Sequence, residues 1–177
     1  MNPAASSWLK FAGATAVAAL GLWFLGARAL QATRDGEEGL KVWFYDESEQ
    51  RLYPRSADTV PPDDGVGGRA GDGFKAVVVR LRGPVGQPGE PRVAYLESYS
   101  PELKSMFEGI RRARAARKPY PGPIPSRDSD FVRTNSWVKL PGAAEWVTAD
   151  SSAGAAIMAL WRSWRGADGS PAALVSP

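Results

Sequence analysis

Phe74-Lys75-Ala76-Val77-Val78-Val79-Arg80-Leu81-Arg82 is the clearest strand in this chain of 177 residues. Valines fill its centre, and β-branched residues favour extended backbone. A stretch rich in Gly and Pro follows from 83 to 91, after which Arg92-Val93-Ala94-Tyr95-Leu96 resumes a strand-like composition. We therefore predict a β-hairpin, in which the second segment pairs with the first in the antiparallel sense.

A second hairpin is predicted upstream of the first. Leu40-Lys41-Val42-Trp43-Phe44-Tyr45 is rich in β-branched and aromatic residues, residues 46–50 are polar and turn-like, and Arg51-Leu52-Tyr53 follows them. From Ser56 to Gly73 the composition changes to Pro, Asp and Gly, which indicates a long surface loop. Two hairpins in succession predict an antiparallel sheet of about four strands.

Two helices, 101–118 and 152–165, are predicted to pack on this sheet, which makes the fold class α+β. Ser100 is a good N-cap for the first helix, and Pro101 suits the first helical position because its missing N–H costs nothing there. The apolar side chains recur at i, i+3, i+4 and i+7 and are expected to face the sheet: Leu103, Met106, Phe107 and Ile110 in one helix, and Ile157, Leu160, Trp161 and Trp164 in the other.

The remaining segments complete one predicted domain over residues 35–166. Alternate prolines from Pro119 to Pro125 predict a stiff, polyproline-like spacer at 119–126. The span from Phe131 to Leu140 has the composition of one more, irregular strand. The small and polar residues of 167–177 predict a flexible tail.

The first 34 residues differ in composition, because Phe11 to Ala27 form a run of 17 residues without a charge. As a helix, this run spans about 25 Å, the lower limit for a bilayer core. We therefore predict a retained anchor, residues 1–34, whose transmembrane helix contacts the membrane through residues 8–28. The alternative is a cleaved signal peptide, because Ala27-Arg28-Ala29 fits a signal peptidase site.

Both interpretations are compatible with a soluble domain on the extracytoplasmic side, which is the side we expect. The protein is thus expected to be a single-pass, signal-anchored membrane protein of the cell envelope. The basic residues that flank the run do not settle its orientation, since Lys10 precedes it and Arg28 and Arg34 follow it.

Histidine and cysteine are both absent from the sequence. The first absence removes the usual general base and the Ser-His-Asp triad, and the second removes thiol nucleophiles, disulfides and thiolate metal sites. We therefore predict no catalytic residue, no metal and no cofactor. Residues 65–70 match a dinucleotide-binding pattern but lack the required strand and helix around it. Residues 136–139 match the S-x-x-K motif of penicillin-recognising serine enzymes, but in an extended segment rather than a helix.

Acidic side chains offer two further hypotheses. Asp63, Asp64 and Asp72 carry oxygen ligands suited to a hard cation, although aspartates beside Gly and Pro are common in solvated turns. A carboxylate pair for hydrolysis has four candidates, and their spacing singles out no two of them: Asp46, Glu47, Glu49 and Glu97.

Positive charge is concentrated in one segment of the chain. Residues 101–127 contain seven basic and two acidic residues, a net charge of +5, whereas 35–100 contain eight basic and twelve acidic residues, a net charge of −4. A basic helix end can bind an anionic partner, or it can simply be solvated and complement the helix dipole. Nucleic acid is not expected as the partner, because the rest of the domain is mildly acidic. The candidate binding residues are Arg111, Arg112, Arg114, Arg117 and Lys118.

Several short motifs resemble those of small, membrane-anchored bacterial proteins of uncharacterised function. The motifs are Phe44-Tyr45-Asp46, Leu52-Tyr53-Pro54, Pro61-Pro62-Asp63-Asp64-Gly65, Tyr95-Leu96-Glu97, and Trp146 with the Gly154/Ile157/Trp161 spacing. The resemblance covers most of residues 40–164 and implies a single-pass bacterial protein. It implies no activity and no site residues.

The sequence leaves three functions open. The first is a non-enzymatic interaction or assembly module of the envelope with a protein partner there. The second is a carboxylate-dependent hydrolase of envelope polymers. The third is docking of residues 111–118 on anionic lipid or on an acidic partner.

Overall fold

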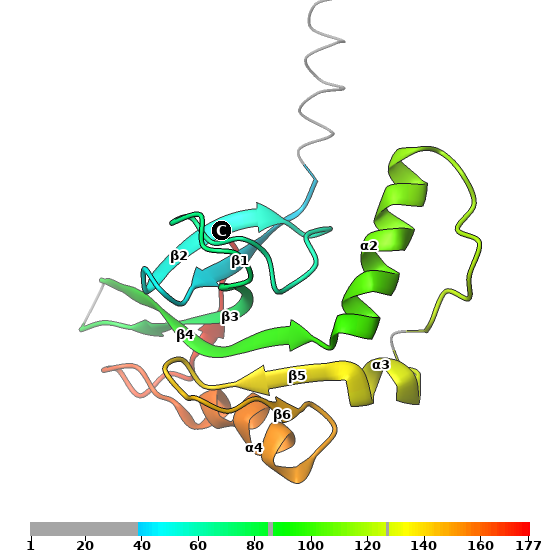
Figure 1. Ribbon diagram of the computed structural model, residues 1–177. Coiled ribbons are helices and arrows are strands. Elements are labelled where there is room, and N and C mark those ends of the chain that lie inside the picture. Colours follow the sequence, from blue (N-terminus) through cyan, green and yellow to red (C-terminus); the bar gives the residue numbers. More distant parts are fainter. Residues whose placement is uncertain (1–38, 85–86, 127) are drawn as a thin grey trace, which may run out of the picture. The chain divides into compact units, whose positions relative to one another are not determined.

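A computed structural model of the protein describes residues 39–84, 87–126 and 128–177, of which 40–177 form one compact unit. Its centre is a seven-stranded antiparallel sheet in the order β2-β1-β3-β4-β5-β6, with β7 paired to β3 (Figure 1). The strands are β1 (Lys41–Asp46), β2 (Arg51–Ser56), β3 (Gly73–Arg82), β4 (Pro88–Tyr99), β5 (Ser136–Lys139), β6 (Val147–Thr148) and β7 (Ala173–Leu174). Both predicted hairpins are confirmed, since β1 pairs with β2 and β3 with β4.

The sheet is strongly curled across its width. β1 and β5 are separated by β3 and β4, so in a flat sheet their backbones would lie roughly 14 Å apart. Yet Glu47, at the end of β1, forms an ion pair with Lys139 of β5, with Nζ 2.6 Å from Oε1. The two outer parts of the sheet therefore approach each other over one face.

Each face of the sheet carries its own apolar core. Inside the curl, Phe74, Ala76, Val78 and Leu96 form a cluster onto which Trp146 packs, its ring 4.9 Å from that of Phe74. The opposite face buries a second cluster: Val79, Ala94, Tyr95 and Val138. A register shift between Val77 and Val78 places Ala94 and Tyr95, neighbours in sequence, in the same cluster.

The helices are α2 (Pro101–Ala115), α3 (Asp130–Asn135) and α4 (Ser152–Leu160), followed by the 3₁₀ helix η1 (Trp161–Ser163). The Ser100 hydroxyl accepts from the backbone N–H of Leu103, and the Ser151 hydroxyl accepts from that of Gly154, so both predicted N-termini are capped by serine. The strand predicted from Phe131 to Leu140 is wrong in its first half. There Ser129 caps α3, and its hydroxyl accepts from the N–H of Val132.

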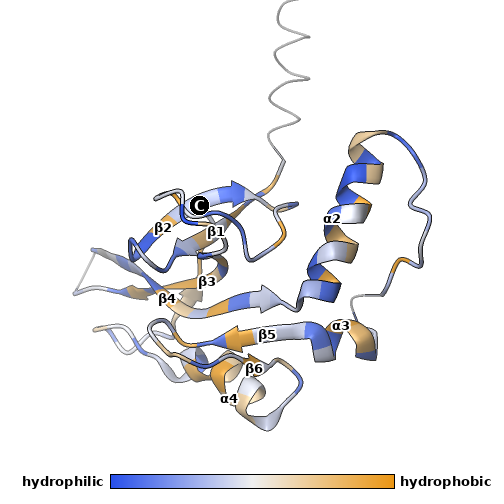
Figure 2. Cartoon of the chain, in the orientation of Figure 1, coloured by the Kyte–Doolittle hydropathy of each residue, from blue (hydrophilic) through white to orange (hydrophobic). Residues whose placement is uncertain are grey.

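The two main helices differ in how much of their apolar surface they bury. Figure 2 shows α4 apolar along most of its length and α2 largely hydrophilic. Ile157 and Trp161 pack onto the second cluster, whereas Leu160, predicted to face the sheet, is 43% exposed. In α2 only Leu103 is buried. Phe107 and Ile110 stay half-buried, because α2 diverges from the sheet along its length (Figure 1).

The predicted fold class requires two corrections. The sheet has seven strands rather than about four, because the short strands β5, β6 and β7 join the four strands of the two hairpins. In addition, none of the helices within 39–84, 87–126 and 128–177 has the length and apolarity needed to cross a bilayer. The predicted anchor, 1–34, lies outside the described residues. The single-pass, signal-anchored architecture and the membrane localisation are therefore not supported, and the fold is that of an α+β domain.

Candidate functional site

One face of the sheet holds a row of polar and aromatic side chains on β3 and β4. Lys75 is directly opposite Glu97, and Val77 is directly opposite Tyr95. Residues two apart in a strand point to the same face, and so do directly opposed residues. These four side chains therefore share a face, which is also the face covered by α4. Tyr99 continues the row to the end of β4.

At the Tyr99 end of this row lies a depression of about 500 Å³, which we call the basic groove. One wall is the face of α2 that carries Phe107, Ile110, Arg111 and Arg114, and the other wall is the loop segment 57–60. Lys75 and Tyr99 contribute from the sheet, and Ile124, Pro125 and Val132 close the remaining side. The rings of Tyr99 and Phe107 meet edge to face at 5.3 Å.

The rim of the basic groove is positively charged. Arg114 reaches across to Asp58 on the opposite wall, with Nη1 3.6 Å from Oδ1, and both side chains are exposed. Lys75 forms an ion pair with Glu97 at 2.7 Å. Arg111 has no ion pair within 4.0 Å among the described residues. The groove thus combines apolar side chains on its α2 wall with an arginine, Arg111, that is available to an anion.

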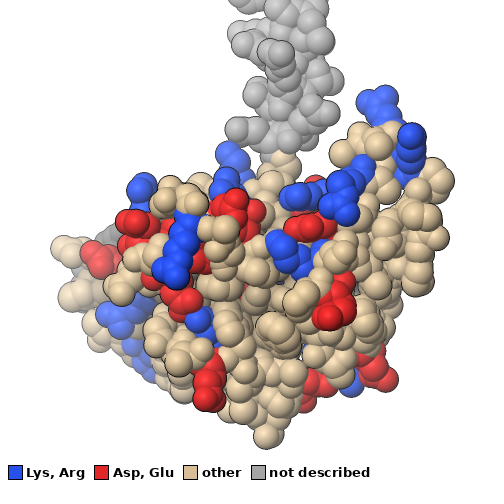
Figure 3. Space-filling view, viewed as in Figure 1, with Lys and Arg blue, Asp and Glu red and all other residues tan. Residues whose placement is uncertain are grey.

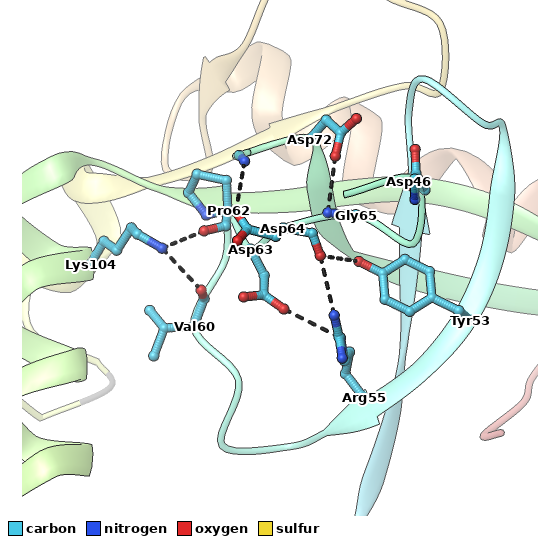
Figure 4. Close-up of polar contacts among 12 residues, drawn as sticks. Asp46, Tyr53, Arg55, Val60, Pro62, Asp63, Asp64, Gly65, Asp72 and Lys104 are labelled. Carbon is cyan, nitrogen blue, oxygen red and sulfur yellow. Dashed lines mark hydrogen bonds and ion pairs between the residues drawn. The ribbon is translucent and has the colours of Figure 1, made fainter. Parts of the chain in front are cut away.

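The loop wall is fixed to α2 by Lys104. Its ammonium group donates to the backbone oxygens of Val60 (3.4 Å) and Pro62 (Figure 4). It also forms an ion pair with Glu108, one turn further along α2, at 3.0 Å. The hydrogen bond from Lys104 holds the pKa of the Glu108 carboxyl below its ordinary value, and the charges of Arg111 and Arg112 act in the same direction. The wall therefore stands at a defined distance from the helix.

The other end of the loop is held by two buried carboxylates. Asp46 accepts from the backbone N–H groups of Glu49 (2.9 Å) and Gly67 (3.1 Å), and Asp72 accepts from that of Gly65 (3.0 Å). Ser48 Oγ lies 3.0 Å from Asp46 Oδ1 and 2.6 Å from Asp72 Oδ2. We call these residues the aspartate clasp. Burial raises the pKa of Asp46, but the hydrogen bonds from Glu49, Gly67 and Ser48 outweigh it, so the net pKa is lowered.

The clasp bears on the two hypotheses built on acidic residues. Asp46 and Asp72 do converge, but each is at most 9% exposed and is satisfied by donors of its own loop. Among the described residues, no group of three or more Asp and Glu side chains is placed to hold a metal ion. The pair therefore stabilises the loop that forms one groove wall, and we assign it no ligand.

The five predicted anion-binding residues do not form one cluster. Arg111 and Arg114 line the basic groove. Arg112 does not line it and pairs with Glu108 at 3.8 Å. Arg117 and Lys118 follow α2 and have no ion pair or side-chain hydrogen bond within the described part of the chain. Figure 3 shows Lys and Arg gathered over α2.

A second depression, the apolar pocket, lies at the other end of the row and measures about 470 Å³. Val77 and Tyr95 line it from the sheet, Met158 and Trp161 from α4 and η1, and Leu174 from β7. Burial, together with the nearby charge of Glu97, raises the pKa of Tyr95 to about 12. The phenol is therefore neutral and supplies a mostly apolar surface.

Sequence reasoning missed most of this site. Two residues indicated a polar strip on the sheet: Lys75, in the mostly apolar strand β3, and Glu97, near the end of β4. Their pairing, however, depends on a register that the loop composition does not reveal. The resemblance to membrane-anchored bacterial proteins stays a prediction. The chain matches no protein-family model, no curated protein and no solved structure.

Proposed function

We propose that residues 40–177 form a non-enzymatic interaction module that binds an acidic segment of a protein partner in the basic groove. The observation that carries this proposal is the partly exposed apolar face of α2 that lines the basic groove. Phe107 and Ile110 are only half-buried although they belong to an amphipathic helix, and Arg111 and Arg114 flank them. An apolar stripe that the domain covers only in part, bordered by arginines, is typical of a protein interface.

The shape of the site favours a peptide segment over a lipid surface. The two walls enclose a volume of about 500 Å³, within the range of ligand pockets of roughly 300–1,000 Å³. Phe107 and Ile110 line its sides, where a carboxylate-bearing chain can contact apolar surface and arginine together. A flat layer of headgroups would meet only the rim.

The test is fluorescence anisotropy at about 50 mM salt, where charge contacts are weakly screened. The probe is a fluorescein-labelled, ten-residue Gly/Ser peptide with three consecutive glutamates. We expect the double variant Arg111→Gln, Arg114→Gln to bind it about fivefold more weakly, because two exposed charge contacts are removed. The matched control is Arg80→Gln, Arg92→Gln, which loses the same net charge from exposed residues of β3 and β4.

Two outcomes would contradict the proposal. Equal weakening in both double variants would show that the probe responds to net charge and not to the groove. Binding of vesicles containing anionic phospholipid that depends on Arg111 and Arg114, without any binding of the peptide, would assign the surface to lipid instead.

A further inference from the structure

We infer that the bound segment is extended and bipartite: an acidic residue lies in the basic groove, and an apolar side chain about four residues away fills the apolar pocket. This inference rests on the proposed function and deepens it. It specifies the sequence pattern of the partner, an acidic residue and an apolar residue at a fixed spacing. Neither the basic run nor the basic groove alone specifies this pattern.

The two depressions adjoin on one sheet face. Lys75 lines the basic groove and Val77, two residues further along β3, lines the apolar pocket. On β4, Tyr99 and Tyr95 stand in the same relation, with Glu97 between them. The Lys75–Glu97 ion pair therefore forms the boundary between the two depressions, with 35% and 25% of the two side chains exposed. A bound peptide that crosses this boundary passes over Lys75 and Glu97, whose opposite charges already neutralise each other.

The geometry of β4 sets the spacing of the motif. Tyr95 and Tyr99 are four residues apart on one face, so the two depressions are separated by about 13 Å along the strand. In an extended peptide, side chains at i and i+4 also share a face and are separated by the same distance. An acidic residue and an apolar residue with three residues between them therefore match the two sites together.

The apolar pocket needs an apolar occupant. Leu174 is 61% exposed at its edge, and Met158 is a flexible side chain that can adapt to an incoming group. Arg162, also at the pocket, lies 6.0 Å from the Trp161 ring and keeps positive potential at this end. A leucine-sized side chain in a segment of net negative charge complements both features.

The inference is tested with three peptides in the same anisotropy assay. The first is the acidic probe described above. The other two carry one leucine in addition, four residues after or four residues before the central glutamate, because an extended peptide can cross the sheet face in either direction. We expect one of the two leucine probes to bind the wild-type domain about tenfold more tightly than the acidic probe.

A steric block then assigns this gain to the pocket. Ala155 is exposed on α4 and lines the apolar pocket, whereas its neighbour Ala156 is exposed and does not line it. Ala155→Trp is expected to abolish the tenfold gain and to leave binding of the acidic probe unchanged, and Ala156→Trp is expected to change neither. Circular dichroism melts of both variants check that α4 is intact.

The outcomes separate the inference from the proposed function. If leucine adds nothing in either position, or if Ala155→Trp retains the gain, the bipartite segment is refuted while the groove still binds acid. If the wild-type domain binds none of the three probes, the proposed function fails.

Discussion

Replacing Asp46 by alanine is expected to lower the free energy of unfolding by about 3 kcal/mol, because three donors lose a charged acceptor that holds the loop in place. The Asp46 side chain is fully buried. The N–H groups of Glu49 and Gly67 donate to its two oxygens, and the Ser48 hydroxyl lies within hydrogen-bonding distance. Alanine can satisfy none of them. Urea unfolding, followed by tryptophan fluorescence, measures the loss.

Asp64→Ala is the matched control. Asp64 belongs to the same loop and accepts from the N–H of Gly71 at 3.3 Å, but it is exposed, so water can replace its oxygen. We expect Asp64→Ala to change the free energy of unfolding by less than about 0.5 kcal/mol. Equal effects in the two variants would mean that the loop is not held by the buried carboxylate.

The same residue predicts how stability depends on pH. In the folded protein the pKa of Asp46 lies below its ordinary value of 3.8. A carboxyl whose pKa is lowered by folding contributes stability above its unfolded pKa, and that contribution is lost as pH falls through the folded pKa. Between pH 5 and pH 2, wild-type stability should therefore fall more steeply than that of Asp46→Ala. Parallel curves for the two proteins would contradict this assignment.

The clasp also links stability to binding. The loop that begins after β2 supplies one wall of the basic groove at residues 57–60, and Asp46 and Asp72 hold its returning half. Gly65 lies between the two carboxylates, where an added Cβ would come within 2.2 Å of Asp46 Oδ2 and 2.3 Å of Asp72 Oδ1. The approach of the loop to β1 therefore requires glycine at this position.

The sequence predicted correctly those helices and strands that depend on residues close together in the chain. The valines of β3 and the aromatic residues of β1 indicated strands, and Ser100 indicated the start of α2. The segment 130–135 was misread because Phe131 and Val132 favour strands by composition. There, the cap at Ser129 and the hydrogen bond from the Asn135 side chain to the Phe131 carbonyl stabilise a helix instead.

The candidate site was predictable only in part, because it depends on contacts between residues that are far apart in the sequence. The basic run at the end of α2 identified Arg111 and Arg114, because charge is visible in sequence. Which members of the run face a groove depends on the loop at 57–60, and that contact joins residues about fifty positions apart. The apolar pocket depends on β7, a strand of two residues that pairs with β3. No local pattern reveals such a pairing.

The second large loss of stability is expected when the Glu47–Lys139 ion pair across the curled sheet is broken. Glu47→Gln is expected to lower the free energy of unfolding by about 3 kcal/mol, because it leaves a buried cation without its counter-ion. The Lys139 side chain is only 5% exposed, and both oxygens of Glu47 lie within 2.8 Å of Nζ. The rings of Trp146 and Phe74, at 4.7 Å and 5.3 Å from Nζ, offer the charge only weak compensation.

Lys139→Met distinguishes two contributions to stability: the cost of leaving the buried Lys139 charge unpaired, and the stabilisation that the ion pair itself provides. Methionine keeps most of the side-chain volume against Trp146 and Phe74 and removes the cation, and Glu47, at 32% exposure, can be solvated. The expected change is within about 1 kcal/mol, because buried ion pairs are often replaceable by apolar side chains. The double variant Glu47→Gln, Lys139→Met should then be more stable than Glu47→Gln alone. If the second substitution adds to the loss instead, the ion pair itself stabilises the curled sheet. The interpretation that Glu47 only neutralises the buried charge of Lys139 would then be wrong.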